Sequence, residues 1–97
     1  MRYAIHALDC PTSLPLRTPL RPAHLARLQA LRDAGRLVTA GPFPVLDAPS
    51  TEGGVTGTLV VADFDSLADA QAWFMADPYH SASIYQSWHI TPYLAVF

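Results

Sequence analysis

The sequence contains no lysine and only one cysteine, Cys10. A single thiol cannot form a disulfide within the chain, which fits a reducing compartment. All six basic residues are arginine and the formal net charge is −2, so the basic excess typical of nucleic-acid binding is missing. The chain also lacks the apolar core of a signal peptide and any apolar run of the roughly 20 residues that span a membrane. We therefore expect a cytoplasmic protein whose partners include neither nucleic acid nor membrane.

Charged side chains are scarce, at 14% of the 97 residues, whereas 51% of the residues are hydrophobic. A chain of this length forms a single domain, residues 1–97, and buries only about two-thirds of its unfolded surface. Because a small globule has much surface to cover, so apolar a composition predicts that some surface is buried against a second copy.

Hydrophobic periodicity and turn residues predict four strands and two helices. The strands are expected at residues 2–8, 36–43, 56–64 and 88–97, and the helices at residues 22–34 and 66–77. Residues 9–19 are rich in Pro, Ser and Thr and are interpreted as a loop, and residues 44–54 as a long turn. One more helical turn fits within residues 79–85, and Pro92 predicts that the last strand is an edge strand or carries a bulge.

This element order, β-α-β-β-α-β, is that of the ferredoxin-like α+β fold. It predicts a four-stranded antiparallel sheet with both helices on one face, which leaves the other face open. The first strand offers two alternatives for the residues on the open face: Ala4, His6 and Leu8, or Tyr3, Ile5 and Ala7. Either set is too apolar for open water, so we expect a homodimer in which two sheets pack face to face.

An ionisable ring lies on the apolar stripe of the first predicted helix. On a helical wheel, Leu28 and Leu31 lie within about 40° of His24. Burial disfavours imidazolium, and so does the positive end of the helix dipole, so a buried His24 needs a hydrogen-bond partner. Two interpretations remain open: a core histidine bonded to a backbone carbonyl, and a functional histidine paired with a carboxylate.

Asp77 occupies an unusual position among the acidic residues, because it ends the second predicted helix directly before Pro78. The helix dipole disfavours a carboxylate at that end, so Asp77 needs a cationic partner unless it is simply an exposed helix stop. The other candidates lie in the predicted long turn, on the solvent side of the first helix, or near the start of the second: Asp33, Asp47, Glu52, Asp63, Asp65 and Asp69.

Four motifs follow one another along the chain: R-x-x-H-L at 21–25, A-G-x-L-x-x-A-G-P at 34–42, D-S-L-x-x-A at 65–70 and D-P-Y at 77–79. With these motifs the chain resembles the YCII-related (YciI-like) family over nearly its whole length. The resemblance implies a dimeric α+β barrel and a small enzyme of undefined substrate that works without a cofactor. It also implies that His24 and Asp77 form the active-site pair.

Related dimeric barrels include a dehydrochlorinase that acts on a chlorinated hydroxyhydroquinone. That similarity implies a lyase-like or hydrolase-like reaction in which His24 is the general acid/base and Asp77 fixes its tautomer. The resemblance further implies that Arg17, Tyr79 and Ser13 bind the substrate, with the guanidinium of Arg17 suited to an anionic group. The residue type alone leaves a second interpretation of Arg17 open, an ordinary surface arginine.

The first loop departs from the family pattern. Many relatives have a D-x-P-G-S turn where this chain has Asp9-Cys10-Pro11-Thr12-Ser13. The loss of that glycine predicts a different rim for the pocket.

Other functions are compatible with the same residues. The chain could be a small-molecule-binding dimeric module without catalysis, a purely structural dimerisation module, or a cofactor-independent oxygenase. Four histidines invite a metal hypothesis, but none of them has the spacing typical of metal ligands, so no metal site is expected. Cys10 is a weak candidate nucleophile because the sequence fixes no base beside it.

Overall fold

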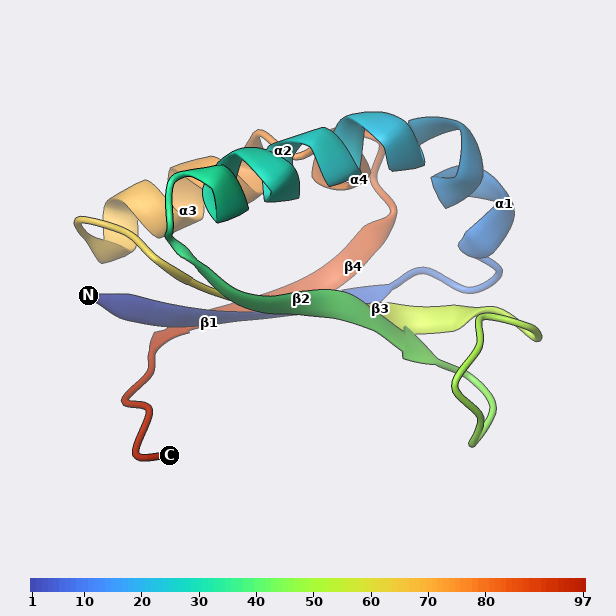
Figure 1. Cartoon of the computed structure of the whole chain (residues 1–97). Helices are drawn as coiled ribbons and strands as arrows, with labels where there is room; N and C mark the ends of the chain where they lie inside the picture. Colours follow the sequence, from blue (N-terminus) through green and yellow to red (C-terminus); the bar gives the residue numbers. More distant parts are fainter.

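The computed structural model describes all 97 residues and has one four-stranded antiparallel sheet with every helix on one face (Figure 1). The elements in chain order are β1 (Arg2–Asp9), α1 (Leu14–Arg17), the 3₁₀ helix η1 (Thr18–Leu20), α2 (Arg21–Asp33), β2 (Leu37–Pro44), β3 (Val55–Asp63), α3 (Leu67–Met75), α4 (Pro78–Ser81) and β4 (Tyr85–Pro92). The strand order is β2-β3-β1-β4, so the predicted ferredoxin-like fold is confirmed. No helix has the length and apolar character needed to cross a membrane.

The core lies between the sheet and the helices. In the central strand β1, Ile5 pairs with Val60 of β3 on one side and with Ile90 of β4 on the other. Alternate residues of a strand point to opposite faces, and the buried set is Tyr3, Ile5 and Ala7. The structure therefore decides between the two alternatives, because Ala4, His6 and Leu8 face away from the helices.

The prediction of a loop over residues 9–19 was wrong. Residues 14–20 form the two short helices α1 and η1, and the N–H groups of Leu16 and Arg17 both donate to the Ser13 carbonyl. Proline predicted a loop here, yet Pro15 is the second residue of α1 and Pro19 is the second residue of η1. A proline costs nothing there, because a helix leaves its first N–H groups unpaired in any case.

The last strand was also predicted in the wrong place, at 88–97 rather than Tyr85–Pro92. The extra helical turn expected within 79–85 exists as α4, and the strand starts soon after it. The strand ends at Pro92, and one further bond, from the Tyr93 N–H to the Arg2 carbonyl, lies where β1 begins. As predicted from that proline, β4 is an edge strand. The chain beyond it leaves the sheet on the side opposite the helices (Figure 1).

Candidate active site

A cavity of about 490 Å³ opens between the helices and one end of the sheet, within the range typical of small-molecule sites. Its lining comes from α1, η1, α2, β2, β3, α4 and the β2–β3 loop. Of the predicted site residues, Arg17, His24 and Tyr79 line this cavity, whereas Asp77 and Ser13 lie behind it. None of the fourteen lining residues is acidic.

His24 and Asp77 are in direct contact. The Nδ1 atom of His24 lies 3.0 Å from Oδ1 and 2.9 Å from Oδ2 of Asp77. Both residues are buried, with 6% and 2% of their surface exposed. A carboxylate only accepts hydrogen bonds, so in the neutral ring the proton is on Nδ1 and the free electron pair is on Nε2. The partner of His24 is therefore a carboxylate and not a backbone carbonyl.

The Nε2 atom of His24 has no hydrogen-bond partner within the protein, yet no fully buried side-chain nitrogen or oxygen is left unpaired. Nε2 therefore keeps some exposed surface. Because His24 lines the cavity, that surface is open to a ligand there.

Asp77 has a different local role from the predicted one. We expected it to end the second helix, but α3 stops at Met75 and Asp77 is the N-cap of α4. Its Oδ1 accepts a hydrogen bond from the Tyr79 N–H at 2.9 Å. The start of a helix favours a carboxylate, so the helix dipole no longer opposes this acid. Pro78 occupies the first turn of α4 and helps to fix the cap.

Arg27, one turn after His24 on α2, holds the same carboxylate. Its Nη1 lies 3.2 Å from Oδ2 of Asp77, its Nη2 donates to the Trp73 carbonyl at 2.7 Å, and its guanidinium lies over the Trp73 ring. Burial alone would raise the pKa of Asp77. The hydrogen bond and charge of His24, with smaller contributions from Tyr79 N–H and Arg27, outweigh burial, and the pKa lies below its usual value of 3.8. Asp77 is therefore ionised at neutral pH. We call His24, Arg27, Asp77 and Tyr79 the Asp77 cluster.

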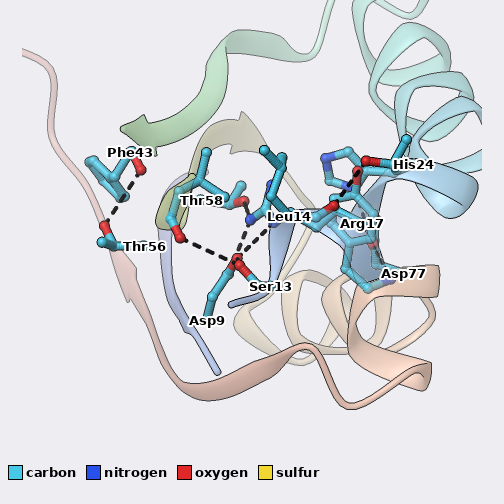
Figure 2. Close-up of polar contacts among 12 residues, drawn as sticks. Asp9, Ser13, Leu14, Arg17, His24, Phe43, Thr56, Thr58 and Asp77 are labelled. Carbon is cyan, nitrogen blue, oxygen red and sulfur yellow. Dashed lines mark hydrogen bonds and ion pairs between the residues drawn. The ribbon is translucent and has the colours of Figure 1, made fainter. Parts of the chain in front are cut away.

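A second buried carboxylate, Asp9 at the end of β1, binds Arg17 of α1 through two parallel hydrogen bonds (Figure 2). The Nε–Oδ2 distance is 2.7 Å and the Nη2–Oδ1 distance is 3.0 Å. The Ser13 hydroxyl donates to Oδ2 of Asp9 at 2.6 Å, and Nη2 of Arg17 also donates to Thr58 Oγ1 at 2.6 Å. We call Asp9, Ser13, Arg17 and Thr58 the Asp9 cluster. Arg17 is thus a buried residue in an ion pair, with only Nη1 lacking a partner within the protein.

Tyr79 connects the two clusters. Its ring stacks on the His24 ring, with centroids 4.1 Å apart and an angle of 16° between the planes. The Arg17 guanidinium carbon lies 4.7 Å from the centre of the same ring. Tyr79 is only 1% exposed, and its hydroxyl has no hydrogen-bond partner within the protein. Because no fully buried polar atom is left unpaired, the hydroxyl keeps some exposed surface, and Tyr79 lines the cavity. Burial raises the pKa of Tyr79, so the phenol stays protonated and acts as a hydrogen-bond donor.

Sequence reasoning missed Asp9, Thr58 and Arg27. Asp9 was read only as part of the first turn, although it is the first residue of the family's turn motif. Arg27 could have been found, because it follows His24 by three residues and therefore lies near it on the helix surface. Thr58 lies within a strand and carries no local signal.

The remaining candidates lie away from the cavity. His6 and His89 pair across β1 and β4 on the open face, and His80 packs on Phe74 and Trp88. Cys10 is a free, half-buried thiol. No group of three or more His, Cys, Asp or Glu side chains lies close enough together to hold a metal ion.

The first turn contains a residue with positive φ, a conformation typical of glycine, although no glycine is present in the turn. Thr12, which stands where relatives carry glycine, has φ of 57°. A β-branched residue rarely adopts this left-handed conformation. Thr12 is therefore a strained position directly before Ser13 of the Asp9 cluster.

Comparisons with known proteins agree with this architecture. The sequence model of the family described as the YCII-related domain matches residues 1–94. Protein YciI of Escherichia coli O6:H1 and protein YciI of Shigella flexneri are each 50% identical to the chain over the whole of both sequences. An uncharacterized protein of Haemophilus influenzae is 42% identical, also over the whole of both.

The solved structures that share the fold include 5-chloro-2-hydroxyhydroquinone dehydrochlorinase (TftG) from Burkholderia phenoliruptrix AC1100, in complex with 2,5-dihydroxybenzoquinone. The TM-score is 0.87 at 22% identity, and the match covers 97% of this chain and 94% of that chain. An identity this low establishes the shared fold and nothing further about the reaction.

Proposed function

The chain belongs to the YCII-related domain family, and from this premise we propose that it is a small enzyme that acts without a cofactor. In this proposal His24 is the general acid/base and Asp77 its orienting partner. The observation that carries the proposal is the buried contact of 2.9 Å between His24 Nδ1 and the Asp77 carboxylate, with Nε2 free at the cavity. The free Cys10 thiol is compatible with the cytoplasm as the place of action.

The chemistry follows from the tautomer of His24. With its Nδ1 proton held by Asp77, the ring presents the Nε2 electron pair to a substrate and accepts a proton there. The imidazolium that forms is stabilised by the ionised carboxylate. The Tyr79 hydroxyl and Arg17 Nη1 are donors at the same cavity and would stabilise negative charge that develops on a substrate oxygen.

Elimination is the first reaction class to consider. Nε2 would take a proton from the substrate, and a small leaving group would depart with its bonding electrons. The structurally similar TftG is named as a dehydrochlorinase, which supports this choice. A hydrolysis, in which Nε2 takes the proton from an attacking water, uses the same groups and is the second class.

The role of His24 can be tested before the substrate is known. The ¹⁵N shifts of its ring should report a proton on Nδ1 in the wild-type protein, and loss of this single tautomer in Asp77→Ala. A ring protonated on Nε2 in the wild-type protein would contradict the proposal.

The activity test is a screen of halogenated hydroxyaromatic compounds and simple esters for turnover. We expect His24→Asn to lower the rate by about 10²–10⁴-fold, which is the usual contribution of a general acid/base. His80→Gln is the control, because His80 lies outside the cavity lining and should keep wild-type activity. Turnover that survives in His24→Asn would rule out the assigned role.

A second function, ligand binding without catalysis, is favoured by one observation. Two polar groups of residues that line the cavity, the Tyr79 hydroxyl and Nη1 of Arg17, have no partner within the protein. Such groups are sufficient to bind a molecule that is never transformed. This alternative predicts saturable binding by calorimetry with no change in the ligand after prolonged incubation.

We also propose that a second copy of the chain covers the open face of the sheet. That face carries Ala4, His6 and Leu8, with Leu8 46% exposed and the Phe43 ring 5.0 Å from the His6 ring. An apolar face of this kind is unfavourable in water. Light scattering should give twice the chain mass for the wild-type protein and the chain mass for Leu8→Arg. Met75→Arg, on the helical side, is the control that should remain dimeric, and a monomeric wild-type protein would contradict the proposal.

A further inference from the structure

Arg21 is a cation of the cavity that has no counter-charge. It begins α2, is exposed, lines the cavity, and forms no ion pair or side-chain hydrogen bond. Arg17 and Arg27 differ from it, because Asp9 and Asp77 neutralise them. No acidic residue lines the cavity, so the positive charge of Arg21 has no counter-charge there.

Two hydrogen-bond donors of the cavity that have no partner within the protein also favour a ligand rich in oxygen atoms. The Tyr79 hydroxyl and Nη1 of Arg17 belong to residues that are 1% and 6% exposed, and neither group is bonded within the protein. Both groups keep some exposed surface, because no fully buried polar atom is left unpaired, and as N–H and O–H donors they are complementary to a ligand that supplies acceptor oxygens. The rest of the lining is largely apolar and includes Leu25 and Leu28.

From these observations we propose that the site takes an organic monoanion with an apolar body, and that Arg21 is the residue that selects its charge. The inference rests on the proposed function and sharpens it. The substrate would be a carboxylate or phenolate that also carries a proton within reach of His24 Nε2. Transfer of that proton leaves imidazolium on the protein and one more negative charge on the substrate, so charge stays balanced within the site.

The geometry gives Arg21 and Arg17 separate roles. Arg17 is held by Asp9 and Thr58 through Nε and Nη2, so only the N–H groups of the single atom Nη1 are free to bind a ligand. Arg21 has its whole planar guanidinium free and lies one helical turn before His24, on the same helix. Arg21 can therefore form the two parallel hydrogen bonds that a carboxylate prefers.

The test compares benzoate with benzamide, which have nearly the same shape and differ in charge. Binding is followed by NMR titration of the His24 and Tyr79 ring signals in the whole protein. We expect the wild-type protein to bind benzoate about 10-fold more tightly than benzamide, in line with the usual strength of a charged hydrogen bond. Arg21→Gln should lose this preference, and Arg21→Lys should keep part of it.

Arg32→Gln is the matched control, because Arg32 is also exposed on α2 and unpaired but does not line the cavity. It should keep the wild-type preference. Equal binding of the two probes, binding of neither, or a preference that survives in Arg21→Gln overturns the inference.

His24→Asn separates this inference from the proposed function. The variant should lose turnover and keep the preference for benzoate, because the selecting charge is on Arg21. Turnover that persists in His24→Asn would reject the catalytic role and leave the charge selection standing. A preference for benzoate that persists in Arg21→Gln would reject the charge selection and leave the catalytic role of His24 standing.

Discussion

The Asp9 cluster and the Asp77 cluster are two solutions to the same problem, the burial of a carboxylate. Asp9 accepts hydrogen bonds from Ser13 and, twice, from Arg17. Asp77 accepts from His24, Arg27 and the Tyr79 N–H. Both carboxylates are almost free of solvent contact, so burial and hydrogen bonding do not distinguish them.

The clusters differ in whether the partner can release its proton. A guanidinium stays charged at every physiological pH, so the Asp9–Arg17 pair is a permanent ion pair and can only hold structure or bind. An imidazole, unlike a guanidinium, can bind and release a proton, which is what the proposed acid/base function requires of the pair formed by Asp77 and His24. A buried acid therefore indicates acid/base chemistry only when the residue beside it can titrate.

The two clusters nevertheless share one ring. Tyr79 contacts both His24 and the Arg17 guanidinium, and its backbone N–H bonds Asp77. The rigid ion pair of the Asp9 cluster thereby helps to fix the ring against which His24 stacks.

Removal of the permanent pair should have the largest effect on stability. Asp9→Ala leaves the Arg17 charge buried without a partner, and we expect the free energy of unfolding to fall by about 3–5 kcal/mol. Urea unfolding followed by circular dichroism measures the change. The double variant Asp9→Leu with Arg17→Met should recover much of the loss, because apolar side chains need no partner. A loss below about 1 kcal/mol in Asp9→Ala would mean that the pair is not held as described.

Asp77→Asn should cost less at neutral pH, about 1–3 kcal/mol, because the amide oxygen still accepts a hydrogen bond but one donor of the cluster loses its acceptor. This loss should depend on pH. The pKa of Asp77 is lowered on folding, so the carboxylate stabilises the protein above its unfolded value of 3.8, and this contribution disappears as pH falls through the lower folded-state value.

Urea unfolding of the wild-type protein and Asp77→Asn, repeated from about pH 4 down to about pH 2, tests that dependence. The difference between the two proteins should shrink over this range. A difference that stays constant down to the lowest pH would show that the charge of Asp77 does not contribute to folding.

The smallest effect is expected at the turn before the Asp9 cluster. Thr12→Gly should raise the free energy of unfolding by about 1 kcal/mol, because glycine adopts a φ of 57° without strain. Thr12→Ala is the matched control and should gain little, since alanine also carries a Cβ. If thermal unfolding shows equal stabilisation by both substitutions, the positive φ of Thr12 is not the cause of the gain.

The sequence predicted the fold correctly because its signals are local. Apolar runs bounded by turn residues, and apolar residues at helical spacing, each act within a few residues, and the topology then has few solutions. The same local reasoning failed at residues 9–19, where prolines that predicted a loop begin helices. It also placed Asp77 at the end of a helix, although an Asp directly before a Pro is equally the local pattern of an N-cap with proline in the first turn, which is what α4 shows.

Local patterns in the sequence were enough to predict the element order, the apolar stripe that carries His24, and Asp77 as a candidate site residue. That these two side chains meet follows from the packing of the helices, because they are separated by 53 residues and no local pattern fixes such a distance. The same packing places Arg17 in an ion pair with Asp9 and leaves Arg21 without an ion-pair partner. Contacts of this kind depend on how the helices pack over the sheet, and packing is a property of the whole chain.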